Sequence, residues 1–185
     1  MPRQLFVFDP PERFVAGTVG QPGDRTFYLQ ASGAGRTVSV ALEKVQVVVL
    51  AERLEELLEE VRRRGAGEVP AVAPRELEDT APLDAPVEEE FRVGTMGLAW
   101  DGESSRVVVE ALAPAQDPEQ EDVEPLSESD EGPDALRVLM TADMARAFVQ
   151  RAQRVVAAGR PPCPLCALPL DPEGHICPRQ NGHRR

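Results

Sequence analysis

The sequence predicts an α+β fold in which two β-β-β-α units share a mixed or antiparallel sheet core, with two helices packed on it. The first observation is a recurring motif: FVAGTVG at 14–20 is matched by FRVGTMG at 91–97, with Phe, Gly-Thr and a closing Gly at the same spacing. The second is the order of the patterns that follow, which is the same in both halves. Because both the motif residues and the order of the strand and helix patterns agree between the halves, we interpret the body as an internal repeat.

Further β-rich stretches follow the motif in each half. They are RTFYLQA (25–31) and TVSVAL (37–42) in the first half, and SRVVVEA (105–111) and ALRVLM (135–140) in the second. An additional strand, RQLFVF (3–8), precedes the first unit. The glycines of GTVGQPGD (17–24) and SGAGR (32–36) are typical of hairpin turns, because neither stretch opens a helix after a strand and no Gly-Lys-Ser/Thr follows.

A first helix is expected from about Glu43 to Arg64. Its apolar residues recur at helical spacing and form one face: Leu50, Leu54, Leu57, Leu58 and Val61. The β-branched run VQVVVL (45–50) is also compatible with a strand, but the second half has a helical pattern at the equivalent point, so we interpret it as helix. Gly65 ends this helix after three arginines that complement the negative end of its dipole.

The second helix is expected over 141–159, where Thr141 is the N-cap and Gly159 and Pro161 end the pattern. Its expected apolar face consists of Met144, Phe148, Ala152 and Val155.

Four regions are expected along the chain: 1–65 with the first unit and its additional strand, a Pro-rich acidic linker at 66–90, the second unit at 91–159, and a tail at 160–185. Within the second unit, 113–134 contains nine acidic residues, four prolines and no basic residue. Such a segment buries too little apolar area to offset its ordering entropy, so we expect a disordered loop between two strands.

Composition restricts the classes of partner. Hydrophobic residues make up 42% of the chain but aromatic ones only 4%, so Val, Leu and Ala must build the core. A formal net charge of −12 argues against broad contact with nucleic-acid backbone or an anionic membrane surface. We therefore expect a protein partner or a small anionic ligand; the oligomeric state is not predicted.

No apolar run has the length of a signal peptide or approaches the roughly 20 residues of a membrane helix. These observations predict a cytoplasmic protein, in which cysteines are reduced and available to a metal ion.

The last 23 residues contain all three cysteines and both histidines. Cys163, Cys166, His175 and Cys177 form the pattern C-x₂-C-x₈-H-x-C, a complete Cys₃His set for a structural Zn²⁺ in a zinc knuckle. His183 is an alternative fourth ligand, although it lies close to the chain end. Knuckles often have Gly after the second Cys, where φ is positive, and this chain has Ala167 there.

Other interpretations of the tail are a redox dithiol, an iron site or an unliganded segment. A redox C-x-x-C needs its first Cys at a helix N-terminus, whereas this pair follows a helix through Gly-Arg-Pro-Pro. Iron is a weaker choice, because a lone mononuclear Cys₃His site is more often zinc. A closed four-ligand site has no position for an activated water, so the expected role is structural.

The body lacks histidine, the commonest general base, so a Ser-His-Asp type of hydrolase is not expected. Arg13, Arg25 and Arg36 could converge near the mouth of the first unit and bind an anion, but we favour the alternative that they simply lie along the edge of a sheet.

Three functions remain open. We favour a non-enzymatic binding or adaptor module over an enzyme of phosphate- or nucleotide-related metabolism that uses carboxylates and arginines. The third is a nucleic-acid role through the tail, aided by Arg179, Arg184 and Arg185, against which the acidic body argues.

FDPPERFVAGTVGQPGDRTFYLQA (8–31) and the tail CPLC…GHICPRQNG together resemble an uncharacterised actinobacterial family, known as a domain of unknown function or "repeat protein". The resemblance covers nearly the whole chain but implies no activity. Tails of the family are similar to CPLCG…GHxCPRxNGY, with an aromatic residue at the position of His183 and Gly at that of Ala167. The resemblance therefore implies that His175 is the fourth ligand.

Overall fold

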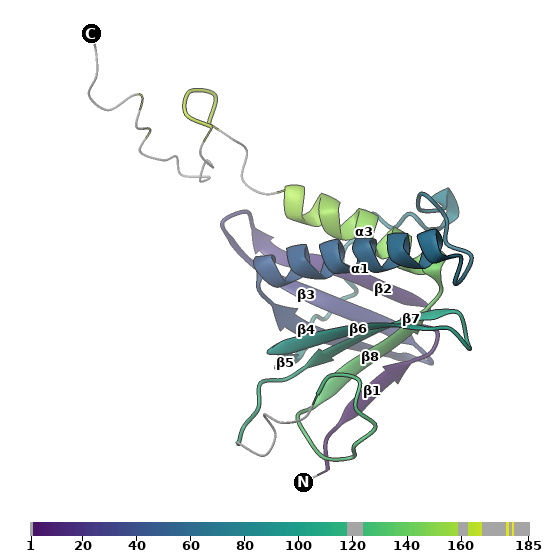
Figure 1. The fold of residues 1–185 in the computed structure, drawn as a ribbon. Helices are drawn as coiled ribbons and strands as arrows, with labels where there is room; N and C mark the ends of the chain where they lie inside the picture. The colour runs from purple at the N-terminus through teal and green to yellow at the C-terminus, as the bar shows by residue number, and fades with distance from the viewer. Residues whose placement is uncertain (1, 118–123, 159–162, 168–176, 178, 180–185) are drawn as a thin grey trace.

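The computed structural model describes residues 2–117, 124–158, 163–167, 177 and 179. It has the predicted α+β class, with two helices and two four-stranded mixed sheets in the described ranges. Figure 1 shows the helices α1 and α3 side by side in one layer across the sheets.

The first sheet has the strand order β2-β3-β4-β5. Strands β2 (Arg13–Gln21), β3 (Asp24–Gly33) and β4 (Arg36–Leu42) form an antiparallel meander with tight turns, as the glycine-rich stretches predict. Strand β5 (Glu89–Arg92) joins the edge of this sheet parallel to β4.

The second sheet has the order β1-β8-β7-β6. Strands β6 (Thr95–Asp101), β7 (Arg106–Leu112) and β8 (Ala135–Met140) form a second antiparallel meander. Strand β1 (Leu5–Phe8) lies parallel to β8. Each half therefore gives its leading strand to the sheet of the other half, which the sequence patterns did not reveal.

The two matched motifs do not occupy equivalent positions. FVAGTVG lies wholly inside β2, whereas FRVGTMG begins in β5 and ends in β6. The order of meander and helix nevertheless agrees between the halves. The internal repeat thus stays a prediction, supported by the order of elements and not by the register of the motif.

Both helices begin where the sequence predicts. Helix α1 (Lys44–Arg64) includes the β-branched run and starts at Glu43, which forms a capping box with Gln46. Gly65 ends it in the left-handed conformation with φ 63°. Helix α3 (Ala142–Ala157) starts at Thr141, whose hydroxyl accepts a hydrogen bond from the Met144 N–H.

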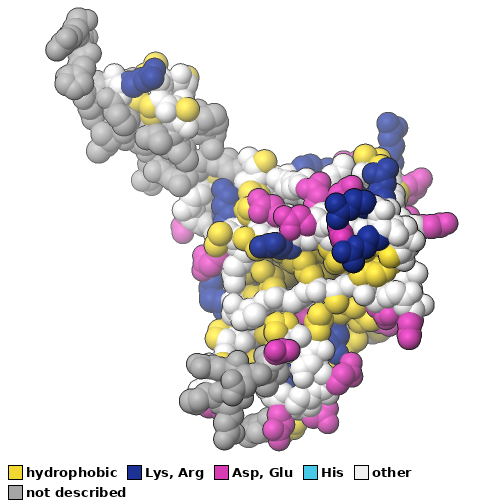
Figure 2. Space-filling model, in the orientation of Figure 1, with side chains coloured by type: hydrophobic (Ala, Val, Ile, Leu, Met, Phe, Trp, Pro, Cys, Tyr) yellow, Lys and Arg dark blue, Asp and Glu magenta, His cyan; other side chains and the backbone are white. Residues whose placement is uncertain are grey.

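One continuous core lies between the helices and the sheets. Its fully buried members include Leu29, Leu54, Leu58, Val138 and Phe148. Figure 2 shows charged side chains over the helix layer and apolar side chains exposed between α1 and β6. No helix in the described ranges is long and apolar enough to cross a membrane.

The expected linker at 66–90 and acidic loop at 113–134 both make specific contacts in their described parts. The linker includes a short 3-10 helix, η1 (Arg75–Leu77), and buries Leu83 against Gly17. In the loop, Leu126 donates its backbone N–H to Glu110. The disorder expected for 113–134 as a whole stays a prediction.

Candidate functional site

The three arginines considered for an anion site do not converge, so the structure excludes a site formed by all three. Arg13 and Arg36 lie at one end of the first meander, and Arg25 lies at the other, opposite Gly20. Arg36 donates to the carbonyl of Val7 at 2.6 Å and covers the ring of Phe8. The three residues belong to three different strands, and Arg25 lies at the end of the meander away from the other two.

Arg25 instead caps the second helix. Its guanidinium donates to the carbonyls of Val155 at 3.3 Å and Ala158 at 3.2 Å, and it lies over the ring of Phe27 at 4.8 Å. A cation at this end stabilises the helix because it satisfies carbonyls that lack intrahelical partners. Arg25 therefore holds the point from which the tail leaves the body.

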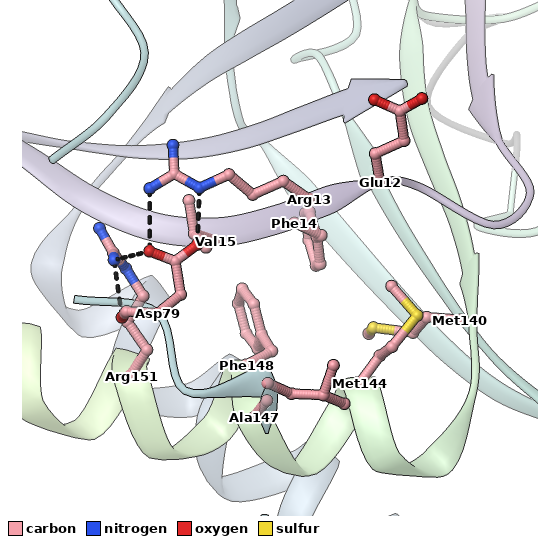
Figure 3. Close-up of a pocket in the computed structure, with 11 residues that line it drawn as sticks. Glu12, Arg13, Phe14, Val15, Asp79, Met140, Met144, Ala147, Phe148 and Arg151 are labelled. Atoms are coloured by element: carbon pink, nitrogen blue, oxygen red, sulfur yellow. Dashed lines mark hydrogen bonds and ion pairs between the residues drawn. The ribbon is translucent and has the colours of Figure 1, made fainter. Parts of the chain in front are cut away.

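Arg13 binds a segment of its own chain. Its Nε donates to Asp79 at 2.7 Å, and a terminal nitrogen donates to the carbonyls of Ala81 and Pro82. The buried Arg151 contacts Asp79 from the opposite side at 2.9 Å and donates its Nε to the carbonyl of Ala16. Figure 3 shows both guanidiniums turned toward the same carboxylate.

The electrostatics of this cluster are internally balanced. The hydrogen bond from Arg13 lowers the pKa of Asp79, and the same bond raises the pKa of Arg13. Burial lowers the pKa of Arg151. A cavity of about 80 Å³ lies next to the cluster, between β2 and α3, and is lined by apolar residues that include Phe14, whose ring stacks on that of Phe148. Because its charged groups bind one another, the cluster is suited to holding the chain together.

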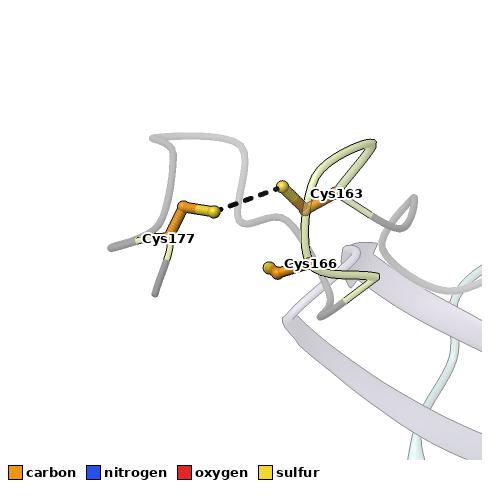
Figure 4. A group of neighbouring side chains, drawn as sticks. All are labelled: Cys163, Cys166 and Cys177. Carbon is orange, nitrogen blue, oxygen red and sulfur yellow. Dashed lines mark hydrogen bonds between the residues drawn. The ribbon is translucent and has the colours of Figure 1, made fainter. Parts of the chain in front are cut away.

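The tail brings the predicted cysteines together. The sulfur atoms of Cys163, Cys166 and Cys177 all lie within 4.8 Å of one another, with 3.9 Å between those of Cys163 and Cys177 (Figure 4). Tetrahedral zinc with Zn–S bonds near 2.3 Å places its sulfurs about 3.8 Å apart. A disulfide would need about 2.05 Å. The three thiols are thus close enough to hold one metal ion, and their sulfur atoms are too far apart for a disulfide.

The local backbone forms the turn that a knuckle requires. Ala167 donates its N–H to the carbonyl of Cys163 at 2.9 Å and has φ 62°, the conformation for which Gly is preferred. Hydrogen bonds from the N–H groups of Leu165 and Cys166 lower the pKa of the Cys163 thiol. The turn therefore favours the thiolate, which is the form that binds metal.

Three of the four predicted ligands are placed by the structure. Cys163 and Cys177 are buried and Cys166 is half-buried. His175 and its alternative His183 lie outside the described residues. Three close cysteines could hold a metal ion, and thiolates favour soft or borderline ions such as zinc.

A family described as a protein of unknown function, DUF3090, matches residues 6–177. The chain belongs to this family. The match covers both sheets, both helices and the three cysteines, and it ends at Cys177. A search of curated proteins and a search of solved structures gave no match.

Proposed function

We propose that this member of the family is a non-enzymatic binding or adaptor protein of the cytoplasm, whose tail is folded by a structural zinc ion. The ligands are Cys163, Cys166, Cys177 and His175. The observation that carries the metal site is the approach of three sulfur atoms to within 4.8 Å of one another. A tail this short has too little core of its own, so a metal ion supplies its folding free energy.

His175 is favoured over His183 by position. The family match ends at Cys177, so His175 lies inside the matched range and His183 lies beyond it. His175 is also separated from Cys177 by one residue, which lets both side chains face one ion from a short extended segment.

A binding role is supported by how the body uses its charged groups. Arg13 and Arg151 bind Asp79, and Arg137 binds the buried Glu110. The body also has no histidine to act as a base. These groups stabilise the fold, which favours binding over an enzyme built on carboxylates and arginines.

Metal content of the purified full chain tests the zinc ion. Wild type is expected to contain about one equivalent of zinc by mass spectrometry, because the four ligands form a closed site. Cys163→Ser and His175→Ala should lose it, while His183→Ala should keep it. Less than half an equivalent in wild type would remove the zinc proposal, and loss only in His183→Ala would reassign the fourth ligand.

Affinity capture tests the adaptor role separately. The full chain is used as bait in native lysate, and the eluate is analysed for proteins and metabolites together. A stoichiometric protein partner without turnover supports the adaptor. A retained metabolite that the protein converts would contradict the adaptor role and support the alternative that the protein is an enzyme.

A further inference from the structure

An apolar groove lies between α1 and β6. Its volume is about 300 Å³, and it is lined mainly by Val45 and Val49 of the helix and Met96 and Leu98 of the strand, with Arg53 at one end. Val45 is 64% exposed and Val49 is 42% exposed. Apolar side chains of this region are visible between α1 and β6 in Figure 2. We call it the α1–β6 groove.

One wall of this groove is the edge of a sheet. Strand β6 is the last strand of the second sheet, with β7 on its inner side. The outer edge of such a strand presents backbone N–H and C=O groups to any extended segment beside it. Apolar grooves of this kind are common binding sites for short peptide segments.

A second groove with the same construction lies between α3 and β2. Strand β2 is the edge of the first sheet, as β6 is of the second. The helix residues correspond one to one, because the N-caps Glu43 and Thr141 are 98 positions apart. The same separation relates the lining residues Leu50 and Phe148, and Arg53 and Arg151. The two grooves are therefore structural counterparts.

The α3–β2 groove is partly covered by the chain itself, and a cavity of about 80 Å³ remains. Leu77 and Asp79 border this cavity together with residues of β2 and α3, and Asp79 is bound to Arg151 of the helix. In the α1–β6 groove the described part of the chain provides no such segment to the lining. Arg53, the counterpart of Arg151, is 68% exposed and pairs with Glu56 of its own helix.

We propose that the α1–β6 groove binds a short segment of a partner protein in which an aliphatic residue precedes a carboxylate by two positions. The aliphatic side chain lies between Val49 and Leu98, as Leu77 lies in the counterpart groove. The carboxylate pairs with Arg53. This inference rests on the proposed binding role and specifies its ligand.

A partner segment is favoured over a second copy of the chain. Two copies would bring together chains of net charge −12 each, whereas a short segment needs only one carboxylate. Repulsion from the rest of the surface falls off over about 8 Å at physiological ionic strength, while the contact with Arg53 is direct.

The test uses a synthetic peptide that copies residues 73–82, APRELEDTAP, because this segment contains Leu77 and Asp79, which border the counterpart groove. Titration into the ¹⁵N-labelled full chain is followed by amide shifts. We expect saturable binding with a Kd of roughly 0.01–1 mM and shifts confined to the first half of α1 and to β6. No saturation up to about 2 mM overturns the inference.

Two exposed substitutions identify the site. Val49→Asp and Arg53→Glu should each weaken binding about tenfold or more, which corresponds to about 1.4 kcal/mol. A peptide with Lys at the Asp79 position should bind Arg53→Glu better than it binds wild type. Val72→Asp, at a residue that is 75% exposed and outside the groove, is the matched control and should bind as wild type.

Two other results would overturn the inference. One is equal affinity in all variants. The other is sedimentation of wild type as a dimer that Val49→Asp converts to a monomer, since the occupant would then be a second copy. The peptide assay is repeated after chelation of metal. If peptide binding is unchanged, the groove does not depend on zinc, and a failure of the zinc proposal leaves the groove proposal intact.

Discussion

The outer faces of the two sheets share one arrangement, a buried polar side chain beneath a covering segment, but this side chain is neutral in one sheet and charged in the other. Each buries one polar side chain on its central meander strand, Gln30 in β3 and Glu110 in β7. Each is covered by a segment that donates a backbone N–H at 2.8 Å to the buried side chain, from Asp84 to Gln30 and from Leu126 to Glu110. The covers are residues 79–84 and 124–129, called here the first and second cover.

The residues opposite differ in charge. Gln30 donates a hydrogen bond to Ser39, its neighbour on β4, at 3.1 Å. The amide and the hydroxyl that form this bond are both neutral. Glu110 accepts from Arg137, its neighbour on β8, at 2.5 Å. Removing one partner of a neutral hydrogen bond costs less unfolding free energy than removing one partner of a buried ion pair. The two sheets therefore have the same geometry at this position but should lose different amounts of stability when it is disrupted.

Glu110→Gln is expected to have the largest effect. The substitution keeps the shape but leaves the largely buried guanidinium of Arg137 without a counter-charge, so unfolding free energy should fall by about 3–5 kcal/mol. Urea unfolding followed by circular dichroism measures it, with the exposed Glu103→Gln as control. The double variant Glu110→Leu with Arg137→Met should recover part of the loss. A cost below about 1 kcal/mol would remove the distinction between the two covers.

Gln30→Leu should cost less. It removes neutral hydrogen bonds to Ser39 and to the backbone of Asp84, which leaves buried groups unsatisfied at a cost of about 1–3 kcal/mol. The same unfolding assay applies, and the exposed Gln21→Leu on β2 is the control. A loss equal to that of Glu110→Gln would show that charge is not what separates the two sheets.

Each cover also packs on a glycine, and this contact distinguishes them further. A Cβ at Gly97 would lie 2.5 Å from the ring of Pro125, and one at Gly17 would lie 2.5 Å from the side-chain end of Leu83. Because a leucine can rotate and a proline ring cannot, Gly97→Ala should cost about 2 kcal/mol and Gly17→Ala about 1 kcal/mol.

Thermal melts of both glycine variants measure this difference. Gly102→Ala is the control, because a Cβ there meets nothing within 4 Å. A larger loss of stability in Gly17→Ala than in Gly97→Ala would mean that the second cover shifts to accommodate the added methyl group more easily than the first.

The smallest expected effect concerns acid sensitivity of the first cover. The bond from Arg13 lowers the pKa of Asp79, so the charged form is favoured on folding. Its stabilisation is present above the ordinary Asp pKa near 3.9 and is lost as pH falls through the lower pKa of the folded state. Asp79→Asn should therefore cost about 1 kcal/mol at pH 7 and progressively less below about pH 4. This cost is below that of Glu110→Gln because Asp79 is 27% exposed to water whereas Glu110 is fully buried, and because Arg13 keeps Asp84 as a partner. Unfolding curves at several pH values test this; a pH-independent difference contradicts it.

Local signals were sufficient for the helices and most strands. Glu43, Gly65 and Thr141 mark helix ends through capping, which depends on neighbours in sequence. The clustering of Cys163, Cys166 and Cys177 was likewise predicted from spacing alone. Helix capping depends on residues a few positions apart, and the cysteine spacing is set by the geometry of a single metal ion, so both can be predicted from the local sequence.

Long-range pairing could not be predicted in the same way. Glu110 looks like a solvated acid in the sequence, and only the second cover makes it buried. Arg151 was overlooked as well, although a cation next to Phe148 and Ala152 on the apolar face of a helix was a signal that it had an internal partner. These roles arise from contacts between segments far apart in the chain.

The position of β1 has a consequence for how the protein is made. Its Leu5 pairs with Ala135, so β1 leaves the ribosome long before the strand that pairs with it. Strand β5 meets β4 much earlier, and the first sheet can close while the second is still incomplete. Strand β1 is therefore paired only after β8 has been made, and a chain whose synthesis stops before β8 has an exposed, unpaired β1.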